Sequence, residues 1–227
     1  MTSRFHFMWV CAVLALCVVT GPMRAEDKAV TKEPEWQALF DGKTLKGWKP
    51  ADFPSGGAIE VKNGVLQMGM GETLSGVTYT NAVPTTDYEV EVEGKKVVGS
   101  DFFCALTFPV GKEHCTFVMG GWGGAVVGIS SIDLMDASEN ETTKYMKFEK
   151  EKWYKVRVKV TGKKIEAWID GEKFADVELE GKKISMRAGD IEQNVPFGIA
   201  SYQTESAFKS VKLRALAPGK PVAPAGQ

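Results

Sequence analysis

The sequence predicts an all-β fold, a β-sandwich or barrel. Several short segments alternate strictly between apolar and polar residues, which is typical of strands with one buried and one solvated face. Turn signals built on glycine, asparagine and aspartate separate these segments, and no segment keeps a helical period for three turns. Residues 137–150 are the stretch most compatible with a helical turn.

The composition is that of a globular protein, and it excludes both a fully disordered chain and a strongly basic nucleic-acid-binding protein. Hydrophobic residues make up 44% of the 227 residues, so the chain has enough apolar surface to build a core and is not disordered throughout. The 28 basic and 29 acidic residues leave a formal net charge of -1. A protein that binds nucleic acid through bulk positive charge is therefore excluded, and the length fits one large all-β domain.

The N-terminal residues have the layout of a secretory signal peptide, residues 1–25. Arg4 precedes an apolar run over residues 7–20, and small Ala25 supplies the cleavage point. The run is short for a membrane span and no second one follows, so the mature chain is expected to have no span. The prediction is export to the periplasm or the extracellular space.

Two other interpretations of this terminus stay open. One is an uncleaved N-terminal anchor, and the other is a lipid anchor on Cys17, although Leu16 stands where a small residue is needed. Residues 26–35 are charged and predict a flexible leader before a domain over residues 36–216. Residues 217–227 predict a disordered, proline-rich tail, because proline donates no backbone hydrogen bond.

The strands are predicted in chain order from these patterns. Asn63-Gly64 favours a type I′ turn between strands at residues 59–61 and 65–68. Asp170-Gly171 does the same for the strands on either side of it. Glutamates form the solvated face of residues 88–93 and basic residues that of residues 155–160, so the two stripes could pair on neighbouring strands. The remaining predicted strands are residues 165–169, 173–177, 197–202 and 208–216.

The segment WQALFDGKTLKGW, residues 36–48, resembles the opening signature of the 3-keto-disaccharide hydrolase family. Further patches resemble family motifs in the expected order. They are EVKNGVL at residues 60–66, DYEV at 87–90, the tryptophan-containing hairpin at 153–171 and PFGI at 196–199. The resemblance covers residues 36–216. It implies an exported all-β domain, a single jelly-roll β-sandwich of the concanavalin A-like or laminin-G-like type, with a carbohydrate site on its concave face.

The opening signature also has a purely structural interpretation. Trp36, Leu39 and Phe40 could fasten the first strand to the core, and Leu45 and Trp48 could return to it. The turn between them is residues 41–42, where the aspartate carboxylate can accept local backbone N–H groups.

The sequence departs from the family on the strands that carry the family's proposed site. Family members have an N-S-G-(I/V) strand and a (Y/H)-E-x-Q-(I/V)-x-D strand. Here residues 99–108 read GSDFFCALTF and residues 114–124 read HCTFVMGGWGG, so the Glu-x-Gln pair is absent. This difference favours a non-catalytic function, whereas the opening signature favours an enzyme.

Three residues are candidates for a catalytic base. Asp101 is an acid on the expected concave face, and His114 is the single histidine after the signal peptide. Asp133 belongs to an acid-rich loop, residues 130–141. Each also has a bland alternative, a surface histidine beside a turn or a solvated loop.

Trp122, Asp136 and Glu139 are candidates for substrate binding. Trp122 stands in GGWGG, where it could stack on a sugar ring or belong to the core of a bulged strand. The two acids belong to the same loop as Asp133, whose carboxylates could bind Ca²⁺. No cofactor is certain, and the metal is unknown.

Cys104 and Cys115 are a possible disulfide. If their hairpin is symmetric about Pro109-Val110, the two cysteines lie opposite each other, whereas another register separates them.

The sequence therefore predicts a carbohydrate-active domain whose partner is an oxidised disaccharide or another glycan. By resemblance it cleaves 3-keto-glycosides: a base removes the C2 proton that the 3-keto group acidifies, the C1 substituent leaves, and water adds. The alternatives are a glycan-binding or cell-surface adhesion module with Trp122 as platform, or a structural envelope domain. The oligomeric state stays open.

Overall fold

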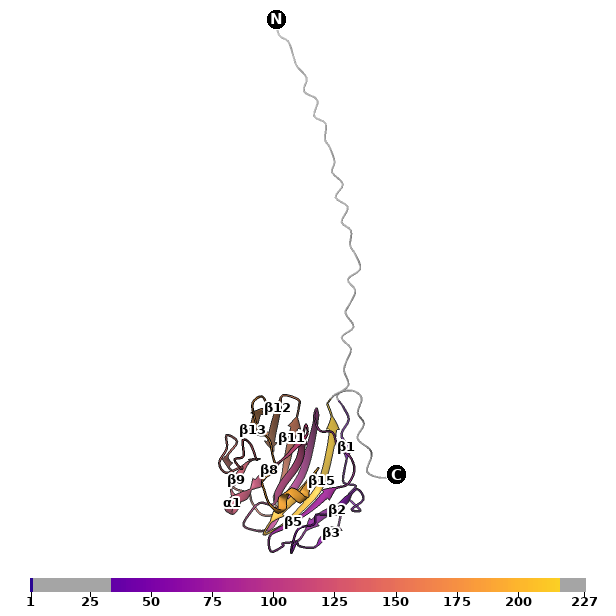
Figure 1. Ribbon diagram of the computed structural model, residues 1–227. Helices are drawn as coiled ribbons and strands as arrows, with labels where there is room; N and C mark the ends of the chain where they lie inside the picture. Colours follow the sequence, from indigo (N-terminus) through magenta and orange to yellow (C-terminus); the bar gives the residue numbers. More distant parts are fainter. Residues whose placement is uncertain (2–33, 217–227) are drawn as a thin grey trace. The chain divides into compact units, whose positions relative to one another are not determined.

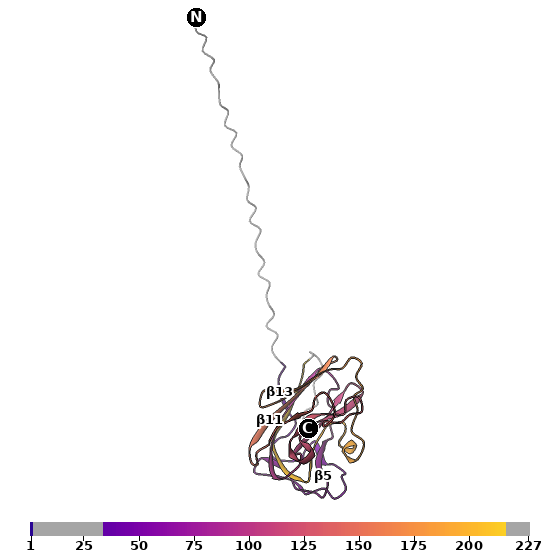
Figure 2. The ribbon, with the colours of Figure 1, turned by 90° about the vertical axis from the view of Figure 1, so that its left-hand side faces the viewer.

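The computed structural model describes residue 1 and residues 34–216. Strands within residues 34–216 form a sandwich of two antiparallel sheets (Figure 1). In the turned view, β11 and β13 lie in one layer and β5 in the other (Figure 2). The predicted all-β jelly-roll class is confirmed. The predicted signal peptide, the tail and most of the leader lie outside the described residues.

Sheet A is the layer that contains both chain-terminal strands of the domain. Its strands run in the order β13 (Glu172–Glu178), β12 (Lys164–Ile169), β11 (Trp153–Val160), β6 (Tyr88–Gly99), β15 (Thr204–Ala215), β4 (Val65–Met68) and β3 (Ile59–Lys62), and β1 (Gln37–Ala38) also pairs with β15.

Sheet B is the opposite layer and carries the candidate site. Its order is β10 (Lys144–Tyr145), β9 (Val126–Ser130), β8 (Glu113–Gly120), β7 (Cys104–Val110), β14 (Gly198–Tyr202), β5 (Leu74–Tyr79) and β2 (Trp48–Pro50). Two short helical segments adjoin sheet B. The segment α1 (Gly121–Gly124) follows β8, and η1 (Asp190–Asn194) precedes β14. The helical turn expected within residues 137–150 is absent, since these residues form loops and β10.

The core lies between the sheets and is built by alternate residues of each strand. On β7 and β8, Leu106, Phe108 and Phe117 are fully buried in the main apolar cluster. Their neighbours Thr107 and Thr116 point to the other side of sheet B, because successive side chains of a strand face opposite ways. The outer face of sheet B therefore carries mainly short side chains, with Thr107 and Thr116 beside apolar Ala105 and Val118.

The predicted hairpin turns are confirmed. Asn63-Gly64 joins β3 to β4 and Asp170-Gly171 joins β12 to β13, each as a two-residue loop. All four residues have positive φ, between 50° and 87°. This is the geometry of the type I′ turn that the sequences favour.

The opening signature is mainly structural, as its pattern indicates. Leu39 and Trp48 are buried, and the Trp48 indole N–H donates to the Leu39 carbonyl at 2.8 Å. Asp41 accepts the backbone N–H groups of Lys43 and Thr44, both at 2.7 Å, and these bonds lower the pKa of its carboxyl. Trp36 is the exception: it lies outside the core, with Arg214 over its ring.

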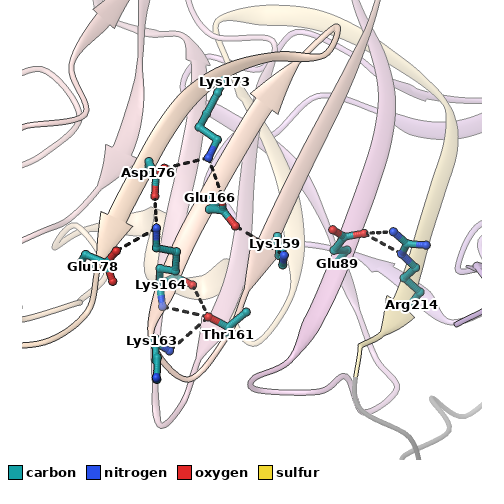
Figure 3. Close-up of polar contacts among 10 residues, drawn as sticks. All are labelled: Glu89, Lys159, Thr161, Lys163, Lys164, Glu166, Lys173, Asp176, Glu178 and Arg214. Atoms are coloured by element: carbon teal, nitrogen blue, oxygen red, sulfur yellow. Dashed lines mark hydrogen bonds and ion pairs between the residues drawn. The ribbon is translucent and has the colours of Figure 1, made fainter. Parts of the chain in front are cut away.

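The outer face of sheet A is covered by ion pairs, as the glutamate and lysine stripes predicted. Register places Arg157 opposite Glu91 and Lys159 opposite Glu89 across β11 and β6. Lys155 bridges the side chains of Glu91 and Glu93. Figure 3 shows that the network continues onto β12 and β13, and that Arg214 of β15 holds Glu89.

The possible disulfide between Cys104 and Cys115 is not formed in the structure. Both residues are buried free cysteines. The β7–β8 hairpin turns at Gly111-Lys112, so Cys115 pairs with Phe108 and Cys104 with Met119. The register is the alternative that separates the two sulfur atoms.

Candidate functional site

A pocket of about 230 Å³ opens on the outer face of sheet B. Its lining comes from outward residues of β5, β7, β8, β9 and β14, from α1, and from the segments before β5, β7 and β14. The lining residues are Thr73, Leu74, Phe102, Ala105, Thr116, Val118, Trp122, Ser130, Arg187, Ala188, Gly189, Asp190, Ile191 and Tyr202. The volume lies just below the range of about 300–1,000 Å³ usual for small-molecule sites, so the pocket suits a ligand of about one sugar ring.

The floor is made of short side chains that leave room above the sheet. Ala105 and Thr116 lie on neighbouring strands, and Ser130 lies on the next strand along. The Thr116 hydroxyl shares a hydrogen bond of 3.0 Å with that of Thr107. The floor can therefore meet a polar ligand with hydroxyl groups while remaining hydrogen-bonded without it.

Three aromatic rings form the walls. Phe102 and Tyr202 pack against each other with ring centroids 5.8 Å apart. Trp122 stands alone in α1 and is 42% exposed, so its alternative placement in the core is wrong. Its backbone is left-handed, with φ of 49°, which is uncommon for a residue that has a Cβ. A half-exposed indole at a pocket rim can cover the apolar face of a sugar ring.

Asp101 holds the loop that presents Trp122. Its carboxylate accepts the backbone N–H of Phe102 at 2.8 Å and that of Gly123 at 2.9 Å. Both carboxylate oxygens are thus engaged by backbone atoms, and Asp101 is outside the pocket lining. The structure places this predicted base as a support for the neighbouring aromatic residues.

Arg187 covers one side of the pocket mouth. Its guanidinium carbon lies 5.7 Å from the centroid of the Trp122 ring, and its Nε lies 3.4 Å from Asp136 Oδ2. The other oxygen of Asp136 accepts both the backbone N–H and the hydroxyl of Ser138. Asp136, a predicted substrate-binding residue, therefore reaches the pocket through Arg187.

The segment η1 brings an acidic residue to the pocket. Asp190 begins this short helix and lines the pocket, and Asn194 ends it, fully buried against β5. The Asn194 amide and the Thr78 hydroxyl are within hydrogen-bond distance at 3.1 Å. Gly198 permits this approach, since a Cβ there would lie 2.3 Å from the Asn194 side chain.

The other predicted residues lie elsewhere. His114 is on the outer face of β8, two residues from Thr116 toward the turn, and burial lowers its pKa. Asp133 accepts the Lys183 N–H at 2.9 Å and pairs with Lys182, and the Lys183 bond is the main cause of its lowered pKa. Glu139 is exposed on the same loop. None of the three lines the pocket.

Arg187, Asp190 and Tyr202 were not singled out from the sequence. All three line the pocket, and Asp190 follows Gly189, a turn signal in the unassigned stretch between two predicted strands. That signal could have marked a loop over the sheet, but nothing in its pattern says which face the loop covers.

The placement of the acidic, histidine and cysteine side chains bears on metal binding. Within residues 34–216, no three His, Cys, Asp or Glu side chains lie together so that they could hold a metal ion. The acidic loop gives no support to a Ca²⁺ site, since three of its four carboxylates, those of Asp133, Asp136 and Glu141, pair with lysine or arginine. In this same part of the chain, no helix is long and apolar enough to cross a membrane.

Solved structures with the same fold are carbohydrate-directed proteins by their descriptions. A putative glycosyl hydrolase from Parabacteroides distasonis is 14% identical, with TM-score 0.52, 80% of this chain covered and 94% of the other. A non-specific endo-β-1,3(4)-glucanase from family GH16 is 10% identical, with TM-score 0.51 and coverages of 82% and 91%. A structure described under endo-acting O-glycanases that initiate mucin breakdown is 13% identical, with TM-score 0.56 and coverages of 82% and 100%. These likenesses show the fold.

Comparison with curated proteins gives no match. The family comparison does: residues 35–214 match the 3-keto-alpha-glucoside-1,2-lyase-like domain, which is most of the chain. The protein therefore contains a carbohydrate-active domain, and it belongs to the 3-keto-alpha-glucoside-1,2-lyase-like domain family.

Proposed function

We propose that the protein cleaves 3-keto-glycosides in the pocket on the outer face of sheet B. The observation that carries the proposal is that one acidic residue, Asp190, and one basic residue, Arg187, both line a pocket walled by aromatic rings. Retaining and inverting glycosidases generally need two carboxylates on either side of the scissile bond. An elimination next to a ketone needs one base and one group that stabilises an enolate.

In this proposal Asp190 removes the proton at C2 of the oxidised sugar. The electron pair forms the C1–C2 double bond as the C1–O bond breaks, and the leaving oxygen takes up a proton. Arg187 stabilises negative charge that develops on the C3 oxygen. Addition of water across the double bond then gives the free 3-keto-sugar. Trp122 orients the ring by covering its apolar face.

The test is incubation of the protein with 3-keto-disaccharides and with the unoxidised parents, followed by NMR in D₂O. Release of the 3-keto-sugar from the oxidised substrates alone, with deuterium at C2, is expected. Asp190→Asn should abolish release. Glu192→Gln is the matched control, because Glu192 belongs to the same short helix but is outside the pocket lining. Cleavage of the unoxidised parents, or full activity of Asp190→Asn, would contradict the proposal.

A glycan-binding module without chemistry is the second candidate. Two observations favour it: the absent Glu-x-Gln pair and an exposed Trp122 at the rim. Folded protein that binds glycans but releases no sugar from any oxidised substrate would favour this candidate. Loss of that binding in Trp122→Ala would then identify the platform. We also propose export, which the signal-like pattern of residues 1–25 supports.

A further inference from the structure

A second cavity, of about 350 Å³, lies on the outer face of sheet A. Its residues come from β3, β4, β6, β11 and β15, and from the turns beside them. It is on the opposite layer from the pocket described above, and the two share no lining residue. Its volume is within the range of about 300–1,000 Å³ usual for ligand sites.

The register of sheet A creates this hollow. Trp153 pairs with Lys95, Lys95 pairs with Ala207, and Ala207 pairs with Gln67, so the four residues form one row across four strands. Side chains in directly paired positions project on the same face. Ala207 is the small residue in the middle of the row, and its larger neighbours form the walls.

The polar groups around the cavity differ from those on the rest of the sheet. Elsewhere on this face, carboxylates and ammonium groups pair with each other across the strands (Figure 3). At the cavity, the side chains of Lys62, Asn63, Gln67 and Glu205 make no hydrogen bond or ion pair with any other described residue. Four unpartnered polar side chains around one hollow are available to a ligand.

Trp153 forms the aromatic side of this cavity, and two lysine side chains hold its ring in place. Lys95 Nζ lies 5.1 Å and Lys209 Nζ 4.9 Å from the centroid of the Trp153 ring. Lys95 also pairs with Glu151, which is a lining residue too. An indole fixed by two ammonium groups gives the cavity a rigid apolar side.

We propose that this cavity is a second binding site, for a neutral glycan. Two lysines and two glutamates among its lining residues balance in charge, so nothing selects an ionic ligand. The amides of Asn63 and Gln67 both donate and accept hydrogen bonds, as sugar hydroxyls do. Trp153 offers apolar surface to the C–H groups of a sugar ring, beside the buried methyl group of Ala207. The inference is independent of any chemistry in the pocket of sheet B.

Affinity electrophoresis tests this in gels that contain a soluble β-1,3-glucan, a β-1,4-xylan or a β-1,4-mannan, with polygalacturonate as the ionic comparison. At least one neutral glycan should retard both the unmodified protein and Trp122→Ala, whose pocket on sheet B is altered. Ala207→Leu fills the hollow and should abolish that retardation. Gln67→Ala should weaken binding by about tenfold, which corresponds to about 1.4 kcal/mol.

The matched control is Glu60→Ala, because Glu60 pairs with Gln67 in the same row but is outside the cavity lining. Circular dichroism spectra must show that every variant is folded. The proposal is overturned if no neutral glycan retards Trp122→Ala, or if folded Ala207→Leu is retarded as strongly as the unmodified protein. Retardation that only Trp122→Ala loses would leave the sheet B proposal in place and overturn this one.

Discussion

The sequence predicts Asp101 as a catalytic base, whereas its surroundings in the structure indicate a supporting role. As an acid before a strand of the site sheet, it is a reasonable candidate base. In the structure its two oxygens accept backbone N–H groups of Phe102 and Gly123, on either side of the aromatic wall. A carboxylate engaged in this way orders the loop that carries Trp122.

Asp101→Asn is therefore expected to weaken ligand binding without changing the pH dependence of turnover. Asparagine replaces one acceptor by an amide donor, which would face the N–H of Gly123. Charged hydrogen bonds of this kind are worth about 1.5–3 kcal/mol when buried, and less here because the site is partly exposed. Rate measurements across pH check the prediction, with Ser100→Ala as a control beside it. Loss of the basic or acidic limb of the profile in Asp101→Asn alone would restore Asp101 as the base.

At the scale of elements, the β7–β8 hairpin decides the state of the cysteines. Its turn at Gly111-Lys112 puts Cys104 and Cys115 at different positions along the ladder. Burial raises the pKa of both thiols far above the ordinary range, because the thiolate loses its solvation.

Both thiols are thus expected to resist alkylation in the folded protein and to react fully after unfolding without a reductant. Alkylation with iodoacetamide before and after denaturation, followed by peptide mass spectrometry, checks this. A peptide in which Cys104 and Cys115 are linked would show that the register is different.

The ion pairs of β12 and β13 make a second prediction at this scale. The pKa of Asp176 is lowered to about 2, first by its hydrogen bond with Lys164 and then by that with Lys173 (Figure 3). Because the folded pKa is depressed, this carboxylate stabilises the fold above its unfolded pKa of about 3.9. That contribution is lost as the pH falls toward 2.

Asp176→Asn should then lower the free energy of unfolding slightly at neutral pH, and the difference from the unmodified protein should vanish between about pH 4 and pH 2. Urea denaturation at several pH values measures it, and added salt should shrink it. Glu172→Gln, on the same strand and without an ion pair among the described residues, is the control. A difference that persists at pH 2 would mean that Asp176 acts through packing.

At the scale of the molecule, the sequence predicted the sandwich well and the site poorly. The period of two in residues 88–93 and the Asn63-Gly64 turn are local signals, and they specify strands and hairpins directly. The pocket is assembled from residues far apart in the chain: Trp122 from α1, Arg187 from a loop, and Tyr202 from the end of β14. No local pattern carries the information that these elements converge over one face.

Two aromatic residues near the β8 terminus show how the architecture separates stability from function. Phe117 is fully buried between the sheets, whereas Trp122, five positions later, stands exposed at the pocket rim. The alternation of β8 and the left-handed turn after it send the two rings to different environments. Truncation to alanine should therefore lower stability at Phe117 and ligand binding at Trp122.

Phe117→Ala is expected to cost about 3–5 kcal/mol, from lost burial and from the cavity that remains. Since domains have only about 5–15 kcal/mol in total, this variant should lose a large fraction of its stability. Trp122→Ala should stay within about 1 kcal/mol of the unmodified protein, as exposed substitutions usually do, while ligand binding at the sheet B pocket falls. Urea denaturation followed by circular dichroism, together with titration of a 3-keto-disaccharide, measures both effects. A strongly destabilised Trp122→Ala would mean that the indole holds the pocket loops together and that its effect on binding is indirect.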